Sequence, residues 1–213
     1  MTGEPRIITS GDGTRLEAEL AAATGVRAPR AGMVLCHPHP QYGGTMRSIV
    51  VCALFASLPA AGVTCLRFNF RGVEGSAGSW DEGRSEQGDA HAAVAALASE
   101  LPAGVPLILA GWSFGADMAL SVLDPAVAAW LAIAPPLHYL TSYDALAGDP
   151  RPKLLALAEH DEVRAPAEVE SLARDWRATE IVVVPGASHF FVGRTDRLVE
   201  VAIDYADRLS PGS

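Results

Sequence analysis

Ser113 lies between two glycines in the pentapeptide 111–115, which reads Gly-Trp-Ser-Phe-Gly. The apolar run at 105–110 before it is typical of a buried strand, and helix-forming residues follow at 116–123. A sharp turn from strand to helix brings backbone segments close together, and the two glycines leave room for that approach. Taken alone, the pentapeptide also fits an ordinary glycine-rich turn. In the sharper interpretation, it presents a serine hydroxyl that attacks once a base removes its proton.

An acid-rich loop and a histidine follow later predicted strands. Acids at 159–162 come after the strand predicted at 153–158, and His189 comes after the strand predicted at 181–184. The carboxyl ends of parallel strands share one sheet edge, so we expect these side chains near Ser113. Serine, then acid, then histidine is one known chain order of a catalytic triad. His189 would be the general base, and the acid would fix its tautomer.

The elements that must position these groups alternate from residue 31 to the end, which predicts an α/β fold with a mostly parallel sheet and helices on both faces. Residues 5–9 and 14–22 predict a hairpin that adds antiparallel strands at one edge. No composition shift marks a second domain, so we expect a single domain over 1–213. The predicted strands are 31–36, 63–70, 105–110, 126–134, 153–158 and 181–184, and the helices are 46–60, 89–101, 116–123, 166–178 and 195–209.

Charge and hydropathy limit the classes of partner. The net charge of -9 disfavours nucleic acids and anionic membrane surfaces as partners. The most apolar region, 105–137, is interrupted by Ser113, Asp117, Asp124 and Pro125, so it predicts core elements rather than a membrane span. We expect a small-molecule substrate, and the oligomeric state stays open.

Three cysteines, Cys36, Cys52 and Cys65, lie in or near apolar segments. An odd number of cysteines in such positions predicts reduced, buried thiols. The first six residues lack the basic and apolar regions of a signal peptide. Together these features predict a cytoplasmic protein.

The sequence resembles the α/β-hydrolase superfamily over most of its length, and within it the small capless bacterial serine hydrolases near the dienelactone hydrolase group. Dienelactone hydrolases proper have cysteine as the nucleophile, so Ser113 argues against that specific activity. Related proteins tend to have glycine where this chain has Glu74. The motifs that carry the resemblance are His37-Pro38-His39-Pro40, Gly43-Gly44-Thr45-Met46, Arg67-Phe68-Asn69-Phe70-Arg71-Gly72, the Ser113 pentapeptide, Asp161 and Gly186-Ala187-Ser188-His189.

The resemblance implies a Ser113–His189–Asp161 triad and no cofactor. Within the acidic loop, it favours Asp161 over Glu159 and Glu162, and the shorter reach of an aspartate agrees with that choice.

A negative charge that develops on the substrate carbonyl oxygen needs two amide donors. The amide of Phe114 lies next to the nucleophile at the start of the predicted helix. Pro38 and Pro40 have no N–H, which leaves the amide of His39 as the nearby second donor in that loop. The resemblance places the second donor at the same position.

Several apolar side chains near these loops either line a substrate pocket or belong to the ordinary core. Trp112 has the same two interpretations, because it either shapes the pocket or packs beneath the turn. His37, His39 and His160 lack cysteine or carboxylate partners at ligand spacing, so no metal site is predicted. The possible pocket residues are Tyr42, Met46, Trp112, Phe114, Leu137, Tyr139, Phe190 and Phe191.

These observations predict a serine hydrolase that cleaves a carboxylic ester or thioester through an acyl-enzyme. The segment 135–152 is too short for a cap domain, which favours an open site and small or extended soluble substrates. Two alternatives stay open. The same triad serves acyltransferases, lyases or biosynthetic cyclases, and a noncatalytic binding protein can use the same fold.

Overall fold

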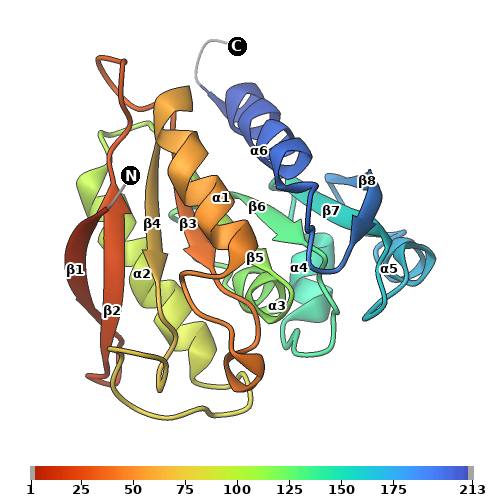
Figure 1. Ribbon diagram of the computed structural model, residues 1–213, viewed down its shortest axis with the longest axis horizontal. Helices are drawn as coiled ribbons and strands as arrows, with labels where there is room; N and C mark the ends of the chain where they lie inside the picture. Colours follow the sequence, from red (N-terminus) through yellow and green to blue (C-terminus); the bar gives the residue numbers. More distant parts are fainter. Residues whose placement is uncertain (1–2, 211–213) are drawn as a thin grey trace.

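The computed structural model describes residues 3–210, in which eight strands form one sheet (Figure 1). The strand order is β1-β2-β4-β3-β5-β6-β7-β8. β2 runs antiparallel to both of its neighbours, and the other pairings are parallel, which confirms the predicted mixed sheet. The strands are β1 (Glu4–Thr9), β2 (Arg15–Ala21), β3 (Ala31–Cys36), β4 (Val63–Phe68), β5 (Leu107–Trp112), β6 (Val127–Ile133), β7 (Lys153–His160) and β8 (Thr179–Ser188).

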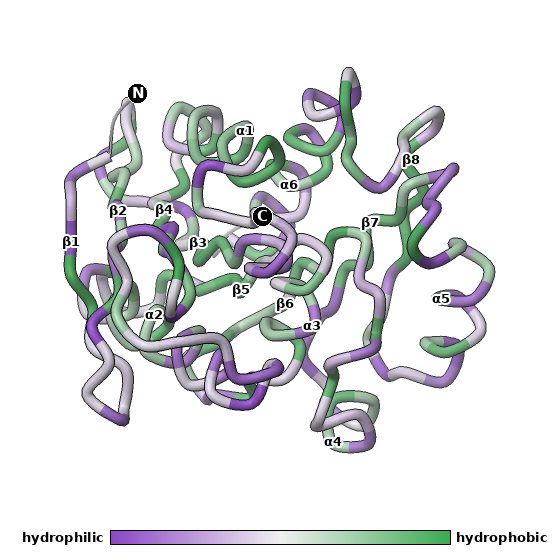
Figure 2. Tube along the Cα trace, turned by 60° about the horizontal axis from the view of Figure 1, so that its bottom comes forward, coloured by the Kyte–Doolittle hydropathy of each residue, from purple (hydrophilic) through white to green (hydrophobic). Residues whose placement is uncertain are grey.

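Helices cover both faces of this sheet, as predicted. α1 and α6 lie on one face, in front of the strands in Figure 1, and α2 and α3 lie on the other. Each face has its own apolar core, and every residue of β3, β4 and β5 is buried between them. Figure 2 shows green, hydrophobic segments along the central strands β3 and β5. The helices are α1 (Ile49–Ser57), α2 (Glu86–Glu100), α3 (Phe114–Ser121), α4 (Tyr143–Gly148), α5 (Pro166–Leu172) and α6 (Thr195–Leu209), with 3-10 turns η1 (Pro40–Tyr42) and η2 (Leu58–Ala61).

Three strands, β5, β7 and β8, extend beyond their predicted carboxyl ends, and these extensions position the site, since β7 continues to His160 directly before Asp161. β5 continues to Trp112, so Ser113 follows the strand directly. β8 continues to Ser188, so His189 also begins the segment after its strand. Between β6 and β7 the chain forms only the short helix α4 and its flanking turns. None of the helices in residues 3–210 has both the length and the apolar character needed to cross a bilayer.

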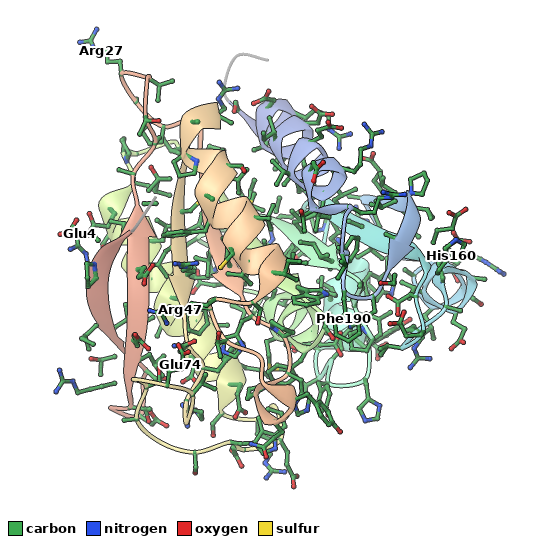
Figure 3. The ribbon with its side chains drawn as sticks, viewed as in Figure 1. Glu4, Arg27, Arg47, Glu74, His160 and Phe190 are labelled. Atoms are coloured by element: carbon green, nitrogen blue, oxygen red, sulfur yellow. The ribbon has the colours of Figure 1, made fainter. Side chains whose placement is uncertain are left out.

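Glu74 adopts a φ of 46°, the left-handed conformation that glycine takes more readily. Its carboxylate accepts hydrogen bonds from Arg47 at 2.6 Å and from the Asn69 side chain at 2.8 Å (Figure 3). These contacts hold the loop in a conformation that a side chain otherwise disfavours. The prediction of buried thiols is correct for Cys36 and Cys65, whereas Cys52, on α1, is only half-buried and donates its S–H to the carbonyl of Arg47.

Candidate active site

Ser113 lies on a strained turn between β5 and α3, with a φ of 55° and a ψ of −123°. A Cβ atom at Gly111 would lie 2.0 Å from the carbonyl oxygen of Gly115. A Cβ atom at Gly115 would lie 2.4 Å from the carbonyl oxygens of Cys36 and His37. Both glycines are therefore required by close backbone approach, and the turn holds the serine side chain at the carboxyl edge of the sheet.

A continuous hydrogen-bonded chain joins Ser113, His189 and Asp161. The Ser113 Oγ lies 2.9 Å from His189 Nε2, and His189 Nδ1 lies 2.9 Å from the nearer Asp161 oxygen. Nδ1 must carry the proton to donate to the carboxylate, so Nε2 is free to accept the serine proton. The side chains of His189 and Asp161 are only 5% and 3% exposed, which keeps water from competing for these contacts.

The other two acids of the same loop hold backbone amides. Glu162 accepts the N–H of His189 at 3.1 Å, and Glu159 accepts the N–H of Gly186 at 2.7 Å. Both contacts fix the segment that carries the histidine. The sequence does not reveal this role of the two glutamates, because each hydrogen bond joins residues that are 27 positions apart.

Further hydrogen bonds position Asp161 and His189. One oxygen of Asp161 accepts the amides of Val163 and Arg164 at 2.9 and 3.1 Å, which orients the carboxylate. The indole N–H of Trp112 donates to the carbonyl of His189 at 3.0 Å. Trp112 therefore both supports the histidine and lines the cavity described below, so the two predicted interpretations of this residue are not exclusive.

His37 is a structural histidine in the loop after β3. Its Nδ1 donates to the carbonyl of Pro38 at 2.6 Å, and its Nε2 accepts the amide of Phe70 at 3.0 Å. Complete burial lowers its pKa to about 4, so the ring is neutral at pH 7. With its hydrogen on Nδ1, the ring connects the loop after β3 to the loop after β4 through these two hydrogen bonds.

His39 lies at the cavity wall with its ring against four aromatic neighbours. Its Nδ1 accepts the amide of Gln41 at 3.1 Å, and its Nε2 lies 3.0 Å from the hydroxyl of Tyr139. Partial burial lowers the pKa of the ring. Those ring neighbours are Tyr42, Trp80, Phe114 and Tyr139, at centroid distances of 4.6 to 5.6 Å.

The two amides expected to bind an oxyanion belong to the first residue of α3, Phe114, and to His39. Phe114 has no acceptor within its own helix, since the first helical N–H groups lack one. Within residues 3–210, the amide of His39 has no backbone or side-chain acceptor.

A cavity of about 790 Å³ opens beside Ser113. Tyr42, Trp112, Tyr139 and Phe190 line it, together with His39 and Phe114. Phe190, labelled in Figure 3, is 52% exposed at the cavity rim.

Three possible pocket residues lie elsewhere. Met46 is fully buried, because Asn69 accepts its amide and draws the segment inward. Leu137 packs against the α2–α3 core, and Phe191 is buried in the core on the opposite face of the sheet. For these three residues the structure supports the core interpretation, one of the two alternatives that the sequence left open.

Asp117 is a fully buried carboxylate on α3 whose role was not predicted from the sequence. Its two oxygens accept the amides of Leu137, His138 and Tyr139 at 2.7 to 2.9 Å. Burial raises its pKa to about 6. A lone aspartate in an apolar helix, one turn after Ser113, was the available signal. Across the described chain, no cluster of three or more histidine, cysteine or acidic side chains forms a metal site.

Comparison with known proteins adds two kinds of relative. No family model matches the chain. An uncharacterized protein from Rickettsia prowazekii is 34% identical, over 94% of this chain and 88% of its own. The solved structure of an alpha-beta serine hydrolase homologue from Coxiella burnetii is also 34% identical, covers 96% of this chain and 98% of its own, and superposes with a TM-score of 0.86. A serine hydrolase without a lid from Xanthomonas campestris is 27% identical, covers 100% and 97%, and has a TM-score of 0.85.

Proposed function

The chain belongs to the α/β-hydrolase superfamily, and we propose that it is a serine esterase or thioesterase that works through an acyl-enzyme. The observation that carries this proposal is the hydrogen-bonded chain from Ser113 through His189 to Asp161, with contacts of 2.9 Å at each step. A serine hydroxyl becomes a competent nucleophile when a neutral imidazole is close and oriented in this way.

In the proposed acylation step, Ser113 Oγ attacks the carbonyl carbon as His189 Nε2 takes its proton. Asp161 stabilises the imidazolium that forms, because its carboxylate already accepts the Nδ1 hydrogen. The imidazolium then gives its proton to the leaving alcohol or thiol, and the acyl-serine remains. A water molecule, deprotonated by the same nitrogen, releases the acid and restores Ser113.

The negative charge of the tetrahedral intermediate requires donors that are already in place. We assign this role to the amides of Phe114 and His39, for which the described chain provides no competing acceptor. The hydrogen bonds of His37 and His39 make the β3 loop rigid, so the second amide needs no reorganisation during the reaction. Loss of one such donor typically raises the barrier by about 3 kcal/mol.

The cavity beside Ser113 suits a small to medium substrate. Its volume of about 790 Å³ falls in the range of small-molecule sites, and aromatic side chains form much of its wall. Only α4 and short turns lie between β6 and β7, so no cap domain closes the site. An extended substrate can therefore reach beyond the cavity rim.

The proposal is tested by the hydrolysis of short p-nitrophenyl esters and acyl thioesters. Ser113→Ala should lower kcat/KM by about 10⁴-fold or more, because the acyl-enzyme cannot form. Ser99→Ala, on the exposed side of α2, is the matched control and should retain full activity. Absence of turnover by the unmodified protein, or full activity of Ser113→Ala, would contradict the proposal.

A further inference from the structure

The charge around the cavity differs from that of the whole chain. The protein has a net charge of -9, yet no aspartate or glutamate lines the cavity within the described residues. Arg164 does line it, and it is the lining side chain that carries a permanent charge. A wall without carboxylates next to a guanidinium favours an anion over a cation.

Arg164 is held in place with most of its donors unused. Its Nε donates to the carbonyl of Pro136 at 3.0 Å, and one Nη donates to Glu168 at 2.9 Å. A guanidinium has about five N–H donors, so three remain, and no acceptor in residues 3–210 contacts them. Glu168 is 58% exposed, which makes it a solvent-screened partner that a substrate group can outcompete.

Tyr139 provides a second donor, because the contacts of His39 determine which ring nitrogen carries the hydrogen. His39 Nδ1 accepts the amide of Gln41, so the neutral ring carries its hydrogen on Nε2 and donates it to the Tyr139 oxygen. Tyr139 therefore keeps its own O–H hydrogen for another acceptor, and no described residue supplies one. The amide of Tyr139 is bound to Asp117 at 2.8 Å, which fixes the ring at the cavity wall.

We propose that the substrate is an ester or thioester that carries a carboxylate, and that Arg164 is the residue that selects it, with the Tyr139 hydroxyl as a second donor. This inference rests on the proposed function. The planar guanidinium matches a carboxylate with two parallel hydrogen bonds. The side chain of Arg164 is only 28% exposed, which reduces the solvent screening of such a contact. Long-range steering is not involved, since the net charge of the protein repels anions.

The test compares two matched pairs of esters. One pair places the charge on the leaving group, as 3-acetoxybenzoate and its neutral counterpart 3-acetoxybenzamide. The other places it on the acyl group, as mono-p-nitrophenyl glutarate and p-nitrophenyl pentanoate. For each protein, the ratio of kcat/KM for the charged ester to that for the neutral ester is measured. Intrinsic differences in reactivity cancel when the ratios of two proteins are compared.

Arg164→Gln should lower this ratio about 10- to 100-fold in at least one pair, because a charge-assisted contact is lost. The readout is the ratio rather than the absolute turnover, because any disturbance of Asp161, which the Arg164 amide holds, affects both esters of a pair alike. Glu168→Gln should raise the ratio, because it removes the competing carboxylate, and Tyr139→Phe should lower it by a smaller factor. Unchanged ratios for Arg164→Gln in both pairs would overturn the inference.

Binding without turnover separates this inference from the proposed function. Ser113→Ala should bind 3-acetoxybenzoate or monomethyl glutarate in calorimetry, and adding Arg164→Gln should weaken that binding about tenfold or more. If that holds while the unmodified protein hydrolyses no ester, the hydrolase proposal fails and the anion site stands. If neutral esters are hydrolysed and binding of both anions is independent of Arg164, the anion site fails alone.

Discussion

Two buried aspartates, Asp161 and Asp117, bind neighbouring loops of the same cavity with different consequences. Asp161 accepts two backbone amides and also the Nδ1 hydrogen of His189. Asp117 accepts three backbone amides and forms no ion pair among the described residues. Burial is therefore common to both residues. The difference is that Asp161 contacts a group able to take a proton from Ser113, whereas Asp117 contacts only backbone.

The positions of the two residues explain why Asp161 contacts His189 and Asp117 contacts only backbone amides. Asp161 lies in the loop directly after β7, at the sheet edge where β5 and β8 also end. Asp117 lies one helical turn after Ser113, and its amide donates to the Ser113 carbonyl at 3.3 Å. Asp117 thus connects the helix that begins at the nucleophile to the β6 loop, which carries Tyr139. Under the proposed mechanism Asp161 serves the chemistry, whereas Asp117 holds the shape of the cavity.

The largest effect is expected from Asp161→Asn. The asparagine oxygen can keep the loop amides, but its NH₂ group then faces His189 and forces the proton onto the wrong nitrogen. We expect kcat/KM for p-nitrophenyl esters to fall by about 10⁴-fold, with a change in the free energy of unfolding below about 1 kcal/mol. Esterase assays and urea unfolding measure the two quantities. Near-normal activity would place the essential acid elsewhere.

Asp117→Asn should lower the free energy of unfolding more than it lowers activity, the reverse of Asp161→Asn. An amide NH₂ in place of one oxygen leaves at least one backbone N–H of the 137–139 segment without an acceptor. Each buried donor left in this way costs about 1–3 kcal/mol, so the free energy of unfolding should fall by that amount or more. Turnover of a neutral short ester should fall by less than tenfold. A loss of activity as large as that of Asp161→Asn would remove the distinction between the two residues.

A smaller effect is expected on how the free energy of unfolding depends on pH. The pKa of Asp117 is raised from 3.8 in the unfolded chain to about 6 in the fold, so the folded state binds the proton more tightly. As pH falls from about 6 to 4, this carboxyl makes a growing stabilising contribution, which Asp117→Asn lacks.

Urea unfolding of both proteins at pH 4.5 and 7.5 measures this term. The stability advantage of the unmodified protein should be larger at pH 4.5 by about 1 kcal/mol or more. The pKa of His37 is lowered to about 4 and acts in the opposite direction, but His37 is present in both proteins and cancels. An advantage that shrinks at pH 4.5 would contradict the raised pKa of Asp117.

The choice of Asp161 among the acids at 159–162 rested on the family resemblance and on its short reach. The sequence itself was sufficient to predict the sheet, its antiparallel edge and the approach of Ser113, that acidic loop and His189. These follow from local patterns and from one topological rule, because the loops after parallel strands meet at one edge. The geometry of the turn was also predictable, since Gly111 and Gly115 meet backbone atoms at 2.0 and 2.4 Å if a Cβ is added.

The cavity wall was less predictable, because it depends on contacts between distant segments. Asn69 draws Met46 inward through its amide, and Asp117 turns the 137–139 segment so that Leu137 faces the core while Tyr139 faces the cavity. Arg164 is placed by the carbonyl of Pro136, 28 positions away. No periodicity or motif encodes such pairings, so the sequence indicated which residues were apolar but not which way they point.

The central claim is that Ser113 is a nucleophile activated by His189. Incubation with a fluorophosphonate, followed by mass spectrometry of the intact protein and of its peptides, tests it most directly. We predict one adduct per chain, located on Ser113, and a loss of labelling in His189→Ala while Asp117→Asn is still labelled. Labelling on another residue, or undiminished labelling of His189→Ala, would contradict the account.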